Sequence, residues 1–178
     1  QLAWEAKALQ TGFSWNPLQL ISTDSRHGAQ FQEQPDGSVL ATGTNRVSDV
    51  YTIEATTTLN RVTAIRLEVL PDKSLPKNGP GRAENGNFVL TTFGVETSSK
   101  DAASESAVYK FRDAHADFSQ KEWDVSLAIN DDAQDGWAVS PQIGKRHVAV
   151  FRFAEPIEAK SPVRLRITLD QSYTQTSS

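Results

Sequence analysis

Alternation of apolar and polar residues with a period of two is the feature that most constrains the fold of this chain. From 163 to 169, Val, Leu, Ile and Leu alternate with Arg and Thr, which is typical of a β-strand with one buried face and one solvent face. The same alternation predicts strands at 51–55, 65–69 and 125–129. Nearly continuous apolar runs predict strands that lie between layers at 88–95 and 148–153. Further strands are expected at 18–22, 39–42 and 107–111.

Turn residues separate these segments. Pro35-Asp36-Gly37 predicts the turn of a β-hairpin over 29–42. Prolines and glycines from 71 to 81 break both helices and strands, so a long surface loop is expected there, with a second polar loop over 97–106. No segment of ten or more residues carries a sustained 3.6-residue apolar stripe. The prediction is an all-β protein, an antiparallel β-sandwich of jelly-roll type.

Length and composition limit the function further. The 178 residues are enough for one domain, 1–178, with a sizeable core. A net charge of −4 argues against nucleic acid as a partner, and no apolar run is long enough for insertion into a membrane. The absence of cysteine excludes disulfides, zinc–thiolate sites and thiol catalysis. Because the chain starts at Gln1 and contains no methionine, a fragment of a larger multidomain protein is expected.

An acidic loop is the main candidate for a metal site. Asn130, Asp131, Asp132 and Asp135 lie close together ahead of Gly136. Carboxylate and amide oxygens are the ligands that calcium prefers, so a structural calcium ion is expected here. The alternative is a solvated turn, in which Asp and Asn are favoured anyway. The loop lacks the spacing and the terminal Glu of an EF-hand.

Tryptophan side chains are candidates for contact with a sugar, because the apolar face of a pyranose stacks on an indole ring. Trp15 lies in a Ser-Trp-Asn-Pro segment, where exposure is expected. Trp123 and Trp137 are candidates as well, and filling of the core is the alternative, above all for Trp137 beside an apolar strand.

Polar residues of the long loop are candidates for the same ligand. Arg82, Asn85 and Asn87 follow one another within a few residues, and an arginine with amide neighbours suits sugar hydroxyls or a uronate carboxylate. Alternatively, Arg82 ties the loop to the sheet and Asn85-Gly86 forms a turn. His147, ahead of a strand, could bond a ligand hydroxyl or serve as a structural histidine.

Enzyme signatures are missing. The chain has no Gly-x-Ser-x-Gly, Walker or Gly-x-Gly-x-x-Gly motif. Carboxylates are plentiful, but their separations do not follow from sequence. The protein is therefore expected not to be an enzyme itself.

Several segments in order along nearly the whole chain form one set of motifs. The set begins with Trp4, and the others are HGAQFQEQPDGSVLATG, DVYTIEA, the long block at 62–95, ADFSQ, AINDDAQDGWAVSPQIGKRHVAVF and LRITLDQSY. The most distinctive part is GPGRAENGNFVL within the long block. These motifs resemble a domain that recurs in large secreted proteins of Planctomycetes, often beside cytochrome c-like modules. The family usually continues with one more strand, whereas this sequence ends at Ser178.

That domain is similar in turn to galactose-binding-like jelly rolls such as discoidin-type domains. The local match is Ala128-Ile129-Asn130 followed by Gly136-Trp137, where Ala-Ile-Asp-Gly and a Thr before the Trp are usual. The resemblance implies glycan binding, often a structural calcium ion, and a secreted or periplasmic location beside neighbouring domains of the same parent chain.

The expected function is a noncatalytic carbohydrate-binding module that recognises a polysaccharide or cell-surface glycan. The main alternative is a structural or protein-docking domain of an exported cytochrome-associated protein, and a weaker one is a polysaccharide-processing enzyme. An exposed aromatic residue on a concave surface favours the first. A flat apolar patch favours docking, and a pocket with two converging carboxylates favours the enzyme.

Overall fold

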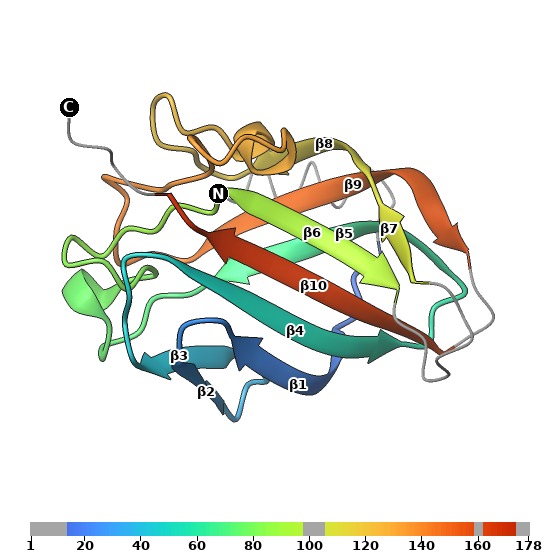
Figure 1. Ribbon diagram of the computed structural model, residues 1–178, viewed down its shortest axis with the longest axis horizontal. Helices are drawn as coiled ribbons and strands as arrows, with labels where there is room; N and C mark the ends of the chain where they lie inside the picture. Colours follow the sequence, from blue (N-terminus) through green and yellow to red (C-terminus); the bar gives the residue numbers. More distant parts are fainter. Residues whose placement is uncertain (1–13, 98–105, 159–161, 174–178) are drawn as a thin grey trace.

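Two antiparallel sheets stacked face to face dominate the computed structural model, which describes residues 14–97, 106–158 and 162–173. The larger sheet has the strand order β1-β4-β10-β6-β7 and the smaller has the order β5-β9-β8. Figure 1 shows the larger sheet in front and the smaller one behind it. The strands are β1 (Gln19–Ser25), β2 (Ala29–Glu33), β3 (Val39–Gly43), β4 (Asp49–Thr57), β5 (Arg61–Val69), β6 (Thr92–Thr97), β7 (Ala107–Tyr109), β8 (Phe111–Ala116), β9 (His147–Glu158) and β10 (Val163–Gln171).

The core lies between the two sheets and is built from alternate residues of the strands. Leu165 and Ile167 of β10 are buried, whereas Arg166 between them is exposed. From the opposite sheet, the Phe151 ring stacks on Phe93 of β6 with a centroid separation of 4.1 Å. Burial of such side chains contributes roughly 1.5–3 kcal/mol each. The prediction of an all-β, antiparallel sandwich is confirmed; the jelly-roll connectivity stays a prediction.

The hairpin expected over 29–42 is present as β2 and β3. The Asp36 carboxylate accepts hydrogen bonds from the backbone and hydroxyl of Ser38, at 3.0 and 2.7 Å. Gly37 has a φ of 81°, a left-handed conformation that glycine adopts without steric cost. Local turn chemistry therefore accounts for this element.

One strand prediction is wrong. Val125–Ile129 is a 3₁₀ helix, η2, although its sequence alternates. The Asp124 side chain caps the helix by accepting from the Ser126 backbone N–H. Val125 and Ala128, three residues apart, are the buried positions, as the threefold period of this helix requires. An Asp ahead of an apolar run was the available helix-start signal.

Two other predictions need new boundaries. The run 88–95 becomes a strand only from Thr92, and ahead of it Leu90 forms an isolated bridge with Trp137. The segment 107–111 is not one strand. β7 ends at Tyr109, β8 begins at Phe111, and the two strands belong to different sheets. Apolar periodicity does not show where a chain leaves one sheet and enters another, so the sequence did not predict this division.

The expected loop at 71–81 is a loop with one short 3₁₀ segment, η1 (Pro76–Asn78). It is closely packed against the following residues: a Cβ on Gly81 would lie 1.8 Å from the Asn87 carbonyl oxygen. Trp4 and most of the polar loop at 97–106 lie outside the described residues. Among the residues that are described, no helix is long and apolar enough to cross a membrane.

Candidate functional site

The acidic loop is held together by its own hydrogen bonds. The Asn130 amide nitrogen donates to both carboxylate oxygens of Asp135, at 3.2 and 3.1 Å. The Asn130 amide oxygen accepts from the Asp132 backbone N–H at 2.8 Å, and Asp132 accepts from that of Gln134. Asp131 forms an ion pair with Lys110 at 3.2 Å. The bonds that Asn130 and Asp132 accept from backbone N–H groups are those of ordinary Asx turns.

This arrangement does not fit a calcium ion. Calcium requires six or more oxygens that converge on one point, but Asn130 presents its N–H groups, and not its oxygen, to Asp135. The Asp131 carboxylate is engaged by Lys110. Within the part of the chain that the structure describes, no group of three or more His, Cys, Asp or Glu side chains is placed to hold a metal. The loop as placed matches the alternative, a solvated turn.

His147 lies in the interior, with 1% of its surface exposed. One ring nitrogen, Nε2, is 2.9 Å from the Gln142 carbonyl oxygen, and Nδ1 is 3.2 Å from a carboxylate oxygen of Asp117. The other oxygen of Asp117 accepts from the Val148 backbone N–H. Since both nitrogens have protein partners, His147 serves the fold and is not available to a ligand.

Arg82 connects the long loop to the β2–β3 hairpin. Its guanidinium donates to the carbonyl oxygens of Gly43 and Thr44, at 2.8 and 3.0 Å, and to the Tyr51 hydroxyl at 3.3 Å. The Asn45 side chain returns a hydrogen bond to the Arg82 carbonyl. These contacts match the alternative role of a tether between loop and sheet.

Asn85 and Asn87 also bond to the protein itself. Asn85 accepts from the Asn87 backbone N–H at 3.0 Å. Asn87 is buried, donates to Gln120 and accepts from the Val139 backbone N–H. Trp137 is fully buried and donates to the Phe118 carbonyl, so it fills the core.

A groove of about 360 Å³ lies along β5, bordered on its other side by residues 14–18. Trp15 is the one predicted ligand residue that lines it, and its side chain is half-buried. The Arg66 guanidinium carbon lies 5.8 Å from the Trp15 ring centroid, within range of a cation–π contact. In this groove, a predicted sugar-contacting residue therefore meets a concave surface.

An irregularity in the pairing of β5 with β9 affects which side chains reach this groove. The register shifts between Val62, which pairs with Ile157, and Ala64, which pairs with Arg152, so the additional residues lie in β9. Val62 and Ile65 are both buried although they are three residues apart, so the alternation of β5 is interrupted at this point. Arg61 and Arg66, which a regular strand would place on opposite faces, therefore share the outer face. The sequence carried a signal for this, because Val62 is out of phase with Ile65.

Charged residues dominate the polar part of the groove. Arg66 forms an ion pair with Glu68 at 2.7 Å, and Glu68 also accepts from Arg146 at 2.8 Å. Arg61 pairs with Glu158 at the start of β5. Glu68 is the single carboxylate among the described residues that line the groove. Sequence reasoning missed Arg61, Arg66 and Glu68 because they read as the solvent face of a strand.

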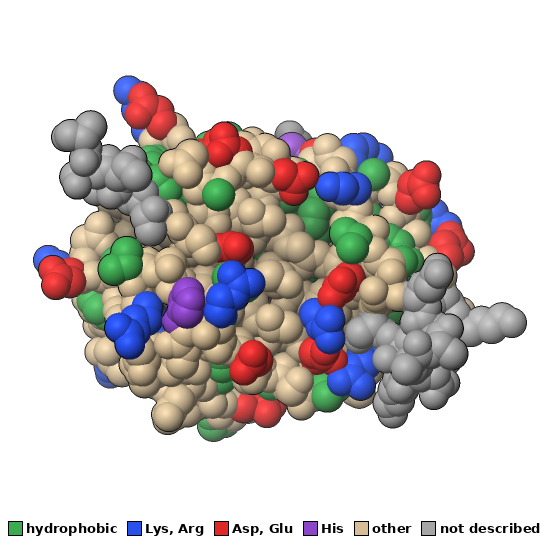
Figure 2. Space-filling view, viewed as in Figure 1, with side chains coloured by type: hydrophobic (Ala, Val, Ile, Leu, Met, Phe, Trp, Pro, Cys, Tyr) green, Lys and Arg blue, Asp and Glu red, His purple; other side chains and the backbone are tan. Residues whose placement is uncertain are grey.

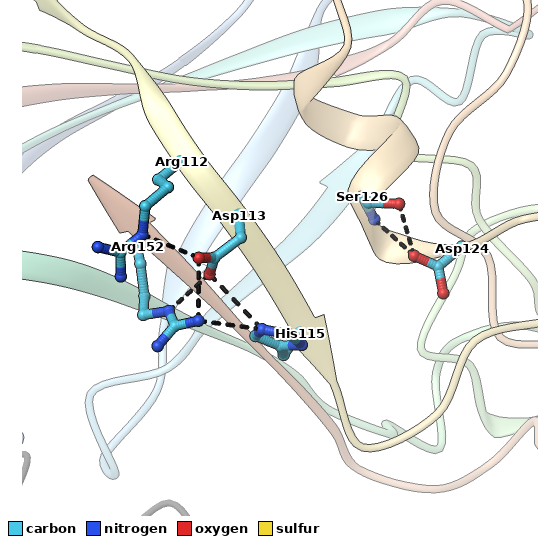
Figure 3. A network of polar contacts seen from close by, with 6 residues as sticks. All are labelled: Arg112, Asp113, His115, Asp124, Ser126 and Arg152. Atoms are coloured by element: carbon cyan, nitrogen blue, oxygen red, sulfur yellow. Dashed lines mark hydrogen bonds and ion pairs between the residues drawn. The ribbon is translucent and has the colours of Figure 1, made fainter. Parts of the chain in front are cut away.

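A second polar cluster lies on the outer face of the same sheet. Figure 3 shows the Asp113 carboxylate between Arg112 and Arg152, with His115 beside them. Burial raises the pKa of Asp113, but hydrogen bonds from Arg152 and Arg112 outweigh it, and the pKa is lowered overall. Here too, a single carboxylate is surrounded by cations. The cluster has the character of an ion-pair network between β8 and β9.

Comparisons of the chain with known protein families, with curated proteins and with solved structures find no match. The function must therefore be argued from the groove and from the chemistry of its residues.

Proposed function

We propose that this protein is a noncatalytic carbohydrate-binding module and that the groove along β5 takes a polysaccharide or glycan chain. The observation that carries the proposal is the half-buried Trp15 in this groove, beside the Arg66 guanidinium. An indole offers an apolar surface to the C–H face of a sugar ring, and a guanidinium donates charge-assisted hydrogen bonds to its oxygens. The two groups together present both kinds of contact that a sugar requires.

The alternative of a protein-docking domain has less support. Docking surfaces are contiguous apolar patches, but the large exposed hydrophobic side chains of the described residues, Ile21, Val47 and Val108, lie in separate elements. Ile21 is on β1 and Val108 on β7, at opposite edges of the larger sheet. Figure 2 shows hydrophobic groups interrupted by polar and charged ones on the face that it presents.

The chemistry of the groove also favours binding over hydrolysis. Glycosidases use two carboxylates that flank the scissile bond. Among the described residues of the groove, Glu68 alone carries a carboxylate, and two arginines engage it. The described lining of the groove therefore does not supply the pair of carboxylates that glycoside hydrolysis uses.

The setting of the module is part of the same proposal. Membership in the Planctomycete domain family, export from the cytoplasm and attachment to further domains are supported by the sequence motifs alone. A noncatalytic module is useful in that setting because it holds its neighbours on a polysaccharide surface.

A panel of soluble polysaccharides, measured by affinity gel electrophoresis and calorimetry, tests the proposal. We expect Trp15→Ala to weaken binding to any glycan that binds the wild type by roughly tenfold or more, since about 1.4 kcal/mol corresponds to a factor of ten. Trp123→Ala is the matched control: Trp123 is half-buried, packs edge-on against Tyr173 and does not line the groove. If Trp15→Ala is folded and binds the glycan as tightly as wild type, the glycan does not bind at Trp15 in this groove.

A further inference from the structure

We infer that the ligand of the β5 groove is an anionic polysaccharide, one whose sugars carry carboxylate or sulfate groups. This inference rests on the proposed function and narrows it to a substrate class. It begins from the sign of the charge in the groove. Arg61 and Arg66 line it together with one acidic residue, Glu68, on a chain whose net charge is −4. Among the described residues that line the groove, two arginines therefore face one carboxylate, which favours an anionic ligand there.

The guanidinium of Arg66 has unused hydrogen-bonding capacity. Its carboxylate partner, Glu68, also accepts from Arg146, so Arg66 shares this carboxylate with a second arginine. In addition, the Arg66 Nε is buried and has no acceptor among the described residues. Glu68 therefore does not use the full hydrogen-bonding capacity of this guanidinium, which has five N–H donors.

Arg61 is free to exchange its partner at low cost. It pairs with Glu158, but the two side chains are 60% and 63% exposed. Exposed ion pairs contribute little net free energy because both groups are well solvated. A carboxylate or sulfate on a ligand can thus replace Glu158, and a guanidinium binds both anions through paired hydrogen bonds.

The spacing of the two arginines indicates a polymer and not a single sugar. Arg61 and Arg66 both line the groove, on either side of the point where the alternation of β5 is interrupted. Five residues at about 3.3 Å each separate them by roughly 16 Å along the strand, which is longer than one sugar ring. A chain with charges on successive sugars can reach both arginines at once, with Trp15 beside the second of them.

Two matched polymer pairs test this inference by calorimetry with the purified protein. Polygalacturonate is compared with its methyl ester, and dextran sulfate with dextran. We expect the charged member of at least one pair to bind about tenfold more tightly or better, and its affinity to fall as salt screens the contacts. Preference within the first pair identifies a carboxylate ligand, and preference within the second a sulfate ligand.

The variant Arg61→Gln/Arg66→Gln assigns the effect to the groove. We expect it to lose about tenfold in affinity for the charged polymer and much of its salt dependence. Arg112→Gln is the matched control, because Arg112 is similarly exposed (59%), is also ion-paired and lies on β8 outside the groove. Should the double variant melt at a much lower temperature than wild type, Arg61→Gln alone, at an exposed position, gives the same comparison.

The outcomes separate the inference from the proposed function. Equal binding of charged and neutral polymers, or full affinity in the arginine variants, overturns the anionic class and leaves glycan binding in place. If only neutral glycans of the wider panel bind, the anionic class is likewise overturned and glycan binding is kept. If no polysaccharide binds at all, both the inference and the proposed function are wrong.

Discussion

At the scale of single residues, the loop aspartates and asparagines of this protein act on their own backbone. Asp36, Asp72 and Asp124 each accept hydrogen bonds from the N–H and hydroxyl of a serine two residues later. The acidic loop repeats the scheme at Asn130 and Asp132. An Asx turn of this kind needs one oxygen and a nearby N–H, so it forms without any metal.

Asn130→Asp tests the metal-free interpretation. The substitution removes two N–H donors to Asp135 and sets two carboxylates against each other, so we expect a loss of stability of about 0.5–1 kcal/mol at low salt. Urea unfolding measures it, with Asp132→Asn as the control, because that change keeps an acceptor oxygen. We expect calcium to leave the melting temperature of the wild type unchanged. A clear rise with calcium would show that the loop rearranges around the ion, as the sequence first suggested.

At the scale of elements, a few polar side chains fix the loops against the sheets. Arg82 ties the loop 71–87 to the end of β3 and to Tyr51 of β4. Gly81 allows the loop to close on Asn87, where a Cβ would collide with the backbone. Loops that are bonded this closely behave as part of the scaffold, and no residue of the loop 71–87 is among those that line the groove along β5.

Arg82→Ala should lower stability and leave glycan affinity unchanged. The variant leaves two carbonyl oxygens and one hydroxyl without their donor, and because the site is partly exposed we expect a cost of about 1–2 kcal/mol in the free energy of unfolding. Arg46→Ala, at an exposed arginine in the same β3–β4 connection, is the control. Loss of glycan affinity with full stability would instead make Arg82 a ligand contact.

At the scale of the whole molecule, ion pairs join strands across the outer face of the larger sheet. Glu54 of β4 pairs with Arg164 and Arg166 of β10, and Arg166 also pairs with Glu96 of β6. Burial raises the pKa of Glu54, but hydrogen bonds from Arg166 and Arg164 outweigh it, so the pKa is lowered. Hydrogen bonds to Glu54 and Glu96 raise the pKa of Arg166. The stability of the sandwich is thereby linked to pH.

Glu54→Gln should weaken the dependence of the free energy of unfolding on pH in the acid range. Because the pKa of Glu54 is lower in the folded state than in the unfolded state, its contribution is present above the unfolded value of about 4.5 and is lost as pH falls through the folded value. We expect the variant to lose about 1–3 kcal/mol at neutral pH and to decline less than wild type below about pH 4.5. Urea unfolding over a pH series measures both, with the exposed Glu155→Gln as the control. Parallel profiles for Glu54→Gln and wild type would contradict the linkage.

The sequence by itself determined the elements whose cause is local. Period-two alternation predicted β4, β5 and β10, and Pro35-Asp36-Gly37 predicted the hairpin, because side-chain direction and turn geometry depend on neighbouring residues. Trp15 was predicted as a sugar-contacting residue, and the structure places it in the groove.

The tertiary structure alone decided which distant residues meet. Alternation at 125–129 suited a strand, but the Asp124 cap and the neighbouring β8 made it a 3₁₀ helix. Nothing local indicates that Arg82 reaches the Gly43 carbonyl, that Asp117 receives His147, or that Arg66 lies beside Trp15. These contacts join segments far apart in the chain. Their partners depend on how the two sheets pack and on the irregular pairing of β5 with β9, neither of which apolar periodicity encodes.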